Sequence, residues 1–341
     1  MKVGVRGALG ILLSVALLAW TMRDVHFVEV WQILRTSDLP LFLASATCAT
    51  LTVPLRARRW RTILDPVEKN LPLGQLWRAT AIGVALNNLL PARAGEPARA
   101  YALSRENPKV RFPAAFASLA VDRIFDALVL LLLMFGAMFA PDFPRGAQIA
   151  GQSVTSWAAT GVIGMVALII ILYLIVLFPE RLLLLFEAFS RRVAPKIEAR
   201  GKQALLAFAS GLGVLRNPAR FVSVLWWTVL HWVLQAFAFW LGFRAVGVEA
   251  SMAAALFLQG ILAIAVALPS SPGFFGVFEP VAKAVLVIYN VDPTRAVSWA
   301  IGYHLLSFIP ITLIGCYYFV HLGLRLKELD RSETAEEDEA T

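Results

Sequence analysis

Two long apolar stretches of this chain are each interrupted by proline, glycine and polar or charged residues, and these interruptions restrict the folds open to it. The first runs from Leu86 to Tyr101 (LNNLLPARAGEPARAY), and the second from Ala267 to Pro280 (ALPSSPGFFGVFEP). Backbone groups freed by proline and glycine cannot face hydrocarbon, so breaks at membrane depth must be buried in protein or line a wet cavity. The expected turn residues are Pro91, Gly95, Pro272, Gly273 and Gly276. Paired breaks in two halves of a chain indicate a transporter-like substrate site.

Composition places the chain in the membrane. Its 341 residues are 59% hydrophobic and 16% charged, with a mean hydropathy of +0.70, which indicates an integral membrane protein with several spans. The net charge of +8 comes from short Lys and Arg clusters beside apolar runs, a pattern typical of topology signals rather than nucleic-acid binding. Cys48 and Cys316 lie in apolar runs, and the histidines form no metal-ligand pattern. We therefore expect no cofactor, no metal ion and no nucleic-acid partner.

The apolar runs predict an all-α polytopic membrane protein with about six full spans and two broken segments. Full spans are expected at residues 7–22, 39–55, 112–140, 155–178, 221–246 and 296–322, and broken segments within 74–90 and 252–291. The cluster RARRWR at 56–61 is expected in the cytoplasm by the positive-inside rule, which also places both termini there. Because residues 74–90 have basic residues on both flanks, they are interpreted as a re-entrant hairpin. The alternative is that the broken segments are short spans, giving eight or nine crossings.

The order of these segments predicts a repeat within a membrane domain of residues 1–325. Its halves, 7–140 and 155–322, would each contain three full crossings and one broken segment, so the second half must have the opposite orientation. The basic segment 180–220 is interpreted either as a helix on an anionic membrane surface or as a solvated linker helix. The acidic tail, 326–341, is expected to be disordered.

Charged residues in the first break are the candidate binding site. Arg93, Glu96 and Arg99 are spaced three residues apart and would share one helical face if helix resumes near Pro97. Two guanidinium groups beside a carboxylate can hold a phosphate bidentately, so these residues, with Asn87 and Asn88, are predicted to bind a lipid headgroup. The alternative is a cytoplasmic loop whose arginines only enforce topology.

A second charged group lies inside the fourth membrane segment. Asp122, Arg123 and Asp126 follow Pro113 by nine to thirteen residues, which places them about 14 to 20 Å along a helix. Ionised side chains at this depth are costly unless paired, and they mark either a transport pathway or a salt bridge within the bundle. Two close carboxylates also require a cation, supplied by an arginine or a proton.

Other polar residues receive mostly structural interpretations. Glu279 is predicted to be the counterpart of Glu96 and to pair with Arg123 or Arg99. His231 and His304 are interpreted as packed core residues. The basic cluster is interpreted as a topology signal and headgroup anchor, with the alternative that one of its arginines lines the entrance; these residues are Arg56, Arg58, Arg59 and Arg61. An interfacial belt with packing accounts for Trp226, Trp227 and Trp232.

Three motifs in order, NNLLPARAGEPARA, DRIFD at 122–126 and PSSPGFFGVFE at 269–279, resemble the flippase-like membrane domain of the lysylphosphatidylglycerol synthase family, also called multiple peptide resistance factors. The resemblance extends from about residue 5 to 325. Relatives with both activities carry an aminoacyl transferase domain after the membrane domain, whereas this chain stops at Thr341. The resemblance therefore implies the membrane part alone.

The combined expectation is a lipid translocator of the cytoplasmic membrane, rather than an enzyme with catalytic residues. Its substrate would be an anionic phospholipid or a polyisoprenoid-phosphate-linked lipid, and its protein partner either a second copy or an enzyme of lipid biosynthesis. The alternative is a membrane-embedded transferase, or an accessory subunit, acting on lipid-linked sugars. A transferase would need a general base or metal-binding carboxylates that converge on a cavity, and the candidates are Asp122, Asp126, Glu96 and Glu279. No nucleotide-binding signature is present, so a gradient, mass action or a partner would supply energy.

Overall fold

The computed structural model describes residues 25–90, 94–146, 217–266 and 271–325, together with a few isolated positions before and between these ranges. The helices are α2 (Phe27–Arg35), α3 (Leu39–Leu64), α4 (Leu73–Leu89), α5 (Gly95–Glu106), α6 (Phe112–Ala137), α10 (Pro218–Ala245), α11 (Met252–Ala265), α12 (Phe278–Ile288) and α13 (Pro293–His321), with a 3-10 turn at Pro272–Phe274. Two-residue strands, β1 (Gln148–Ile149) and β2 (Gln152–Ser153), pair antiparallel. The predictions for 180–216 and for the tail 326–341 fall outside the described residues, as do most of those for 7–22 and 155–178.

Polar side chains fix where the main helices begin. Asp38, Asn217, Ser251 and Asp292 each accept a hydrogen bond from the backbone N–H three residues later, at the starts of α3, α10, α11 and α13. These side chains satisfy N–H groups that have no partner within the helix. Local sequence therefore sets the positions at which the helices enter the bundle.

Three described helices are long and apolar enough to cross a membrane: α3, α10 and α13. The predicted span at 112–140 forms α6, whose 26 residues are also sufficient in length, although the helix includes Asp122, Arg123 and Asp126. Four of the expected spans thus correspond to long helices in the described part of the chain.

The helix α3 continues nine residues beyond the predicted end of its span. Pro54 lies inside it, and the helix reaches Leu64. Trp60 and Ile63 are almost completely buried, so the apolar face continues past the basic cluster. The basic cluster 56–61 is therefore the last part of a packed helix, and its cytoplasmic location stays a prediction.

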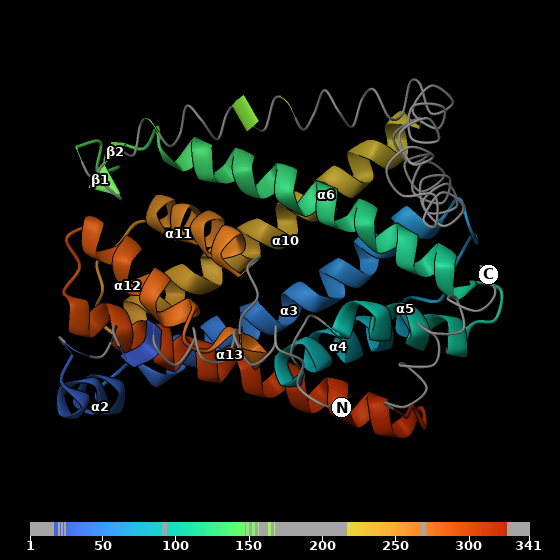
Figure 1. Ribbon diagram of the computed structural model, residues 1–341, viewed down its shortest axis with the longest axis horizontal. Coiled ribbons are helices and arrows are strands. Elements are labelled where there is room, and N and C mark those ends of the chain that lie inside the picture. The colour runs from blue at the N-terminus through green and yellow to red at the C-terminus, as the bar shows by residue number, and fades with distance from the viewer. Residues whose placement is uncertain are drawn as a thin grey trace, which may run out of the picture.

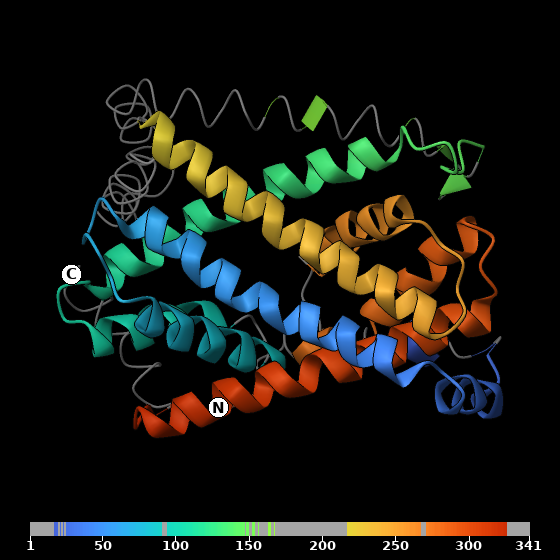
Figure 2. The same cartoon turned by 180° about the vertical axis from the view of Figure 1, so that it is seen from behind.

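The main helices form two sets with the same order: a long helix, a short helix, a break, a short helix and a long helix. The first set is α3, α4, α5 and α6, and the second is α10, α11, α12 and α13. The long helices α3 and α10 lie side by side in opposite directions, and the backbone N–H of Asp38 donates to the carbonyl of Ala245 where one starts and the other ends (Figure 2). The packing of α4 on α13 has its counterpart in the packing of α11 on α6.

The two helical hairpins enter the bundle from opposite ends (Figure 1). The hairpin of α4 and α5 lies at one end and the hairpin of α11 and α12 at the other, with their breaks toward the middle. The breaks meet there: a Cβ atom added at Gly273, where φ is +65°, would lie 3.2 Å from the carbonyl oxygen of Asn88. The described residues Asn88 and Gly273 of the two interrupted stretches therefore pack against each other, as the bilayer requires of irregular backbone.

Candidate functional site

A network of ion pairs joins α3, α5 and α6, and Arg59 of α3 lies at its centre. The Arg59 guanidinium contacts Asp122 at 2.6 Å and Asp126 at 2.5 Å. It also donates a hydrogen bond of 3.2 Å to the Thr228 hydroxyl of α10. The Arg59 and Asp122 side chains have no exposed surface. The arginine required beside the two predicted carboxylates is therefore supplied by a helix more than sixty residues earlier in the chain.

Two further arginines complete the network. Arg99 of α5 contacts Asp122 at 3.1 Å, and its guanidinium carbon lies 4.1 Å from the centre of the Trp60 ring. Arg123 of α6 contacts Glu96 at 2.5 Å and Asp126 at 3.4 Å. The Trp232 indole N–H also donates to Asp126, at 2.8 Å. Exposure increases toward one edge, where 38% of the Arg123 side chain and 21% of the Glu96 side chain are accessible.

The charges of this network balance without Arg56. Three guanidinium groups face three carboxylates, so the formal charge of the six residues is zero. Arg56, one turn before Arg59 on α3, forms no ion pair with another described residue. The buried Nε of Arg56 and the buried Nε and Nη2 of Arg99 find no hydrogen-bond acceptor in the described structure. The site therefore has one excess positive charge and several buried donors available to an anion.

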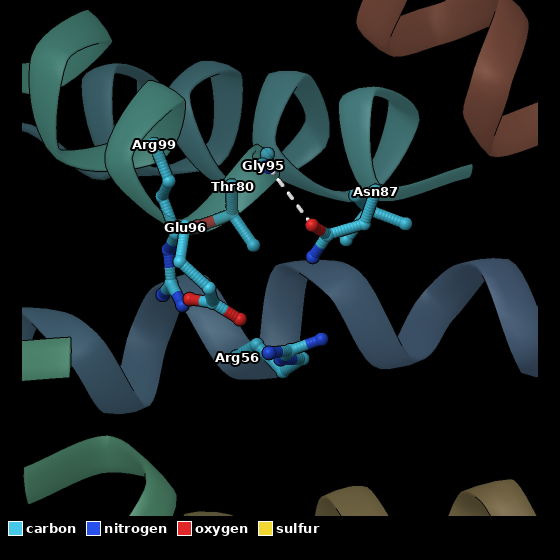
Figure 3. Close-up of a pocket in the computed structure, with 8 residues that line it drawn as sticks. Arg56, Thr80, Asn87, Gly95, Glu96 and Arg99 are labelled. Atoms are coloured by element: carbon cyan, nitrogen blue, oxygen red, sulfur yellow. Dashed lines mark hydrogen bonds between the residues drawn. The ribbon is translucent and has the colours of Figure 1, made fainter. Parts of the chain in front are cut away.

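Arg56 and Arg99 line a narrow cavity between α3 and the first hairpin (Figure 3). The labelled lining residues are Arg56, Thr80, Asn87, Gly95, Glu96 and Arg99. In Figure 3 the Glu96 carboxylate lies between the guanidinium groups of Arg99 and Arg56. The free volume is about 10 Å³, which is about the space that a single water molecule needs. A headgroup phosphate would therefore require the hairpin to move.

Asparagine and glycine hold the first break closed. The Asn87 side chain accepts a hydrogen bond of 2.9 Å from the backbone N–H of Gly95, and Asn88 donates to the Thr312 hydroxyl of α13 at 2.8 Å. Gly83 and Gly95 allow α4 and α5 to approach closely, because a Cβ atom added at Gly95 would lie 1.9 Å from the Gly83 carbonyl oxygen. Asn87 also lines the cavity, so its predicted headgroup contact is compatible with its place. Pro91 and Arg93 lie outside the described residues.

The second break has an equivalent acid with a different partner. Glu279 is the second residue of α12, as Glu96 is of α5. Its carboxylate accepts from the Gly276 N–H at 2.8 Å and lies 2.7 Å from Nδ1 of His304. The His304 Nε2 lies 2.8 Å from the Gly273 carbonyl oxygen, to which it donates.

The predicted pairing of Glu279 with Arg123 or Arg99 was therefore wrong. Each hairpin acid pairs with the last long helix of its own set, and the partners occupy equivalent places. Arg123 is the twelfth residue of α6, and His304 is the twelfth residue of α13. Of the four candidate carboxylates, Asp122, Asp126 and Glu96 belong to one ion-pair network, whereas Glu279 pairs with His304 at the second hairpin.

Two residue roles were missed by the sequence interpretation. Arg59 was grouped with topology arginines, yet it is fully buried in the ion-pair network, so that prediction was wrong for Arg59. Trp232 was assigned to an interfacial belt and packing, yet its indole N–H donates a hydrogen bond to Asp126. The helical spacing of Arg59 with Ile63 was the available signal, since it continues the apolar face of α3. His231 and His304 both have polar partners in the core, in agreement with their predicted packing roles.

The long apolar helices and the buried ionic network define a multi-pass helical membrane protein. Residues 7–315 match the family described as Lysylphosphatidylglycerol synthase TM region. The chain belongs to this family, which confirms the resemblance carried by its three motifs.

Several other proteins are similar to this chain over most or part of its length. The chain is 23% identical to a "UPF0104 membrane protein" of Methanothermobacter thermautotrophicus, over 95% of this chain and 97% of that protein. It is 22% identical to "UPF0104 membrane protein PH1989" of Pyrococcus horikoshii, over 90% and 93%. It is also 35% identical to part of "Glycosyltransferase AglD" of Haloferax volcanii, over 45% of this chain and only 22% of that protein.

Proposed function

We propose that this protein moves an anionic lipid across the membrane, and that the lipid phosphate binds between Arg56 and Arg99 at the first break. The observation that carries the proposal is the uncompensated charge of Arg56 beside a network that is neutral without it. Phosphate oxygens would accept from the unpartnered guanidinium N–H groups, and the planar guanidinium matches a phosphate bidentately. An anionic phospholipid and a polyisoprenoid-phosphate-linked lipid share this chemistry.

The same proposal gives the accessible edge of the network a role. The Arg123–Glu96 pair is the most exposed ion pair of the network. An incoming phosphate would repel the Glu96 carboxylate and attract Arg123. Arg123 would then leave Glu96 and pair with the phosphate. Asp122 and Asp126, held by Arg59, would remain as the fixed part of the site. The ion pairs of α5 with α6 would then respond to the lipid, which couples binding to movement of the first hairpin.

The arrangement supports an inverted repeat of six spans and two re-entrant hairpins, which we include in the proposal. Antiparallel α3 and α10 and the opposite hairpins are the geometry that alternating access requires. We place both termini and the α5–α6 connection in the cytoplasm because of the basic residues there.

Cysteine labelling tests this orientation. In a variant lacking Cys48 and Cys316, a cysteine replacing exposed Lys109 should be protected from a membrane-impermeant thiol reagent added to intact cells. A cysteine replacing exposed Arg145, beyond the other end of α6, should be labelled. Labelling of the Lys109 position with protection of the Arg145 position would reverse the assigned orientation.

Native mass spectrometry of gently extracted protein tests the binding site. The wild-type protein should retain a phosphate-bearing anionic lipid, Arg56→Gln should lose most of it, and Arg56→Lys should retain an intermediate amount because it keeps the charge without the planar fork. Arg105→Gln, a matched change on exposed surface, should bind as the wild type does. Equal retention by Arg56→Gln and wild type would rule out Arg56 as the phosphate site.

A second candidate is an accessory subunit for an enzyme that acts on lipid-linked sugars. The match to part of a glycosyltransferase favours it, since that part resembles 45% of this chain. Lipid movement by the purified protein alone supports the first candidate. Movement only when a lipid-linked-sugar glycosyltransferase is added supports the second.

A further inference from the structure

A second polar site lies at the end of the bundle where α3 ends and α10 begins. It is an open groove with a volume of about 340 Å³, which falls within the roughly 300–1,000 Å³ typical of ligand sites. The side chains that line it include Arg58, Arg61, Thr62, Asp65, Arg220 and Ser223. The groove and the narrow cavity at Arg56 have no lining residue in common.

The groove has the donors that a phosphate ester requires. Three guanidinium groups and a single carboxylate line it, and none of the three arginines forms an ion pair with a described residue. Arg58 is held in place by the Trp227 ring, 5.2 Å from its guanidinium carbon, and it donates to the Thr62 hydroxyl at 3.0 Å. A guanidinium held against an aromatic ring loses less entropy when it binds phosphate.

The surface beside the groove indicates a lipid rather than a soluble ligand. Val222 and Trp226 of α10 flank Ser223 along the helix, and each exposes 61% of its surface. Exposed tryptophan near the end of a membrane helix is typical of the boundary between headgroups and hydrocarbon. A lipid whose phosphate lies in the groove would therefore have an apolar surface available for its chains.

The groove also lies next to the buried network. Arg58 and Arg59 are consecutive on α3, and one lines the groove while the other holds Asp122 and Asp126. Arg56 to Arg61 covers about 7.5 Å along a helix. Measured along the axis of α3, a headgroup in the groove is thus only a few ångströms from the narrow cavity.

We propose that this groove is a capture site, where the phosphate-bearing headgroup of a membrane lipid binds before it reaches the cavity at Arg56. The order of the two steps rests on the proposed lipid translocation. Binding of a lipid in the groove does not require that the protein moves lipid across the membrane. The capture site and the proposed translocation can therefore be disproved separately.

Calorimetric titration of the full-length protein in detergent tests the capture site. The probes are dihexanoyl-phosphatidylglycerol, a phosphodiester with acyl chains, and glycerol phosphate, a monoester that carries more negative charge and has no acyl chains. Arg58→Gln/Arg61→Gln/Arg220→Gln should weaken binding of the short-chain lipid by about tenfold or more. The control, Arg105→Gln/Lys109→Gln/Arg111→Gln, removes equal charge at the same end and should change it by less than about twofold. The wild type should bind glycerol phosphate about tenfold or more weaker than the lipid.

Unchanged lipid binding by the groove variant would overturn the proposal, and so would equal affinity for both probes, because a soluble phosphate would then be the ligand. If the glutamine variant elutes as aggregate, Arg58→Lys/Arg61→Lys/Arg220→Lys replaces it and should still weaken lipid binding through loss of the planar fork. In proteoliposomes the groove variant should need more probe lipid for half-maximal movement and reach the wild-type maximum. Tight binding without any movement by the wild type would leave capture standing and refute translocation.

Discussion

Arg59→Met is expected to destabilise the folded protein by about 3–5 kcal/mol, because it leaves Asp122 and Asp126 buried without their main cation. Both carboxylates lie within 2.6 Å of the Arg59 guanidinium, and the Arg59 side chain has no exposed surface. The remaining arginines, Arg99 and Arg123, are already engaged with the network. Denaturant unfolding in detergent, followed by tryptophan fluorescence, measures the change.

Two companion variants isolate the cause. Arg58→Met removes the neighbouring, partly exposed guanidinium and should cost about 1 kcal/mol or less. Arg59→Met/Asp126→Asn restores a formal charge of zero among the buried residues and should recover part of the loss. If Arg59→Met were no more damaging than Arg58→Met, the carboxylates would not depend on Arg59, and the network as described would be incorrect.

Gly95→Ala should force the first hairpin apart. The new Cβ atom would lie 1.9 Å from the Gly83 carbonyl oxygen and 2.6 Å from the Asn87 amide. The nearest obstacle is backbone, which cannot rotate away as a side chain can, so we expect a loss of about 1–3 kcal/mol or more. Because the cavity at Arg56 uses the same hairpin, retention of anionic lipid should fall as well.

Gly136→Ala is the matched control for this prediction. Gly136 lies within α6, and a Cβ atom added there meets nothing within 4 Å. Alanine is the better helix former by up to about 1 kcal/mol, so this variant should be neutral or slightly more stable. Equal stability of the Gly95→Ala and Gly136→Ala proteins would show that the hairpin is not packed as closely as described.

The two breaks could be predicted from sequence because proline, glycine and the Glu-Pro pairs mark them locally. The equivalence of Glu96 and Glu279 followed from the same spacing, and the structure confirms their equivalent places. The residues that pair with Glu96 and Glu279 could not be predicted from this spacing. These come from α6 and α13, which approach the hairpins only in the tertiary structure.

Arg59 shows a second limit of sequence interpretation. It lies among four arginines within six residues, and the one-dimensional pattern does not separate the fully buried side chain of Arg59 from its neighbours, which line the narrow cavity and the groove. The need for a cation beside Asp122 and Asp126 was predictable from electrostatics alone. Its identity depends on the packing of α3 against α6, helices whose charged residues lie 63 and 67 positions apart.

Movement of fluorescent lipid in proteoliposomes, followed by quenching of the outer leaflet with dithionite, tests the central claim most directly. The wild-type protein should accelerate movement of labelled phosphatidylglycerol or labelled polyprenyl phosphate above the rate in protein-free vesicles, and labelled phosphatidylcholine should move at the protein-free rate. Arg56→Gln should abolish the acceleration, while Arg105→Gln should preserve it. No acceleration of either anionic probe by the wild type, or full acceleration by Arg56→Gln, would contradict a lipid translocator with its phosphate site at Arg56.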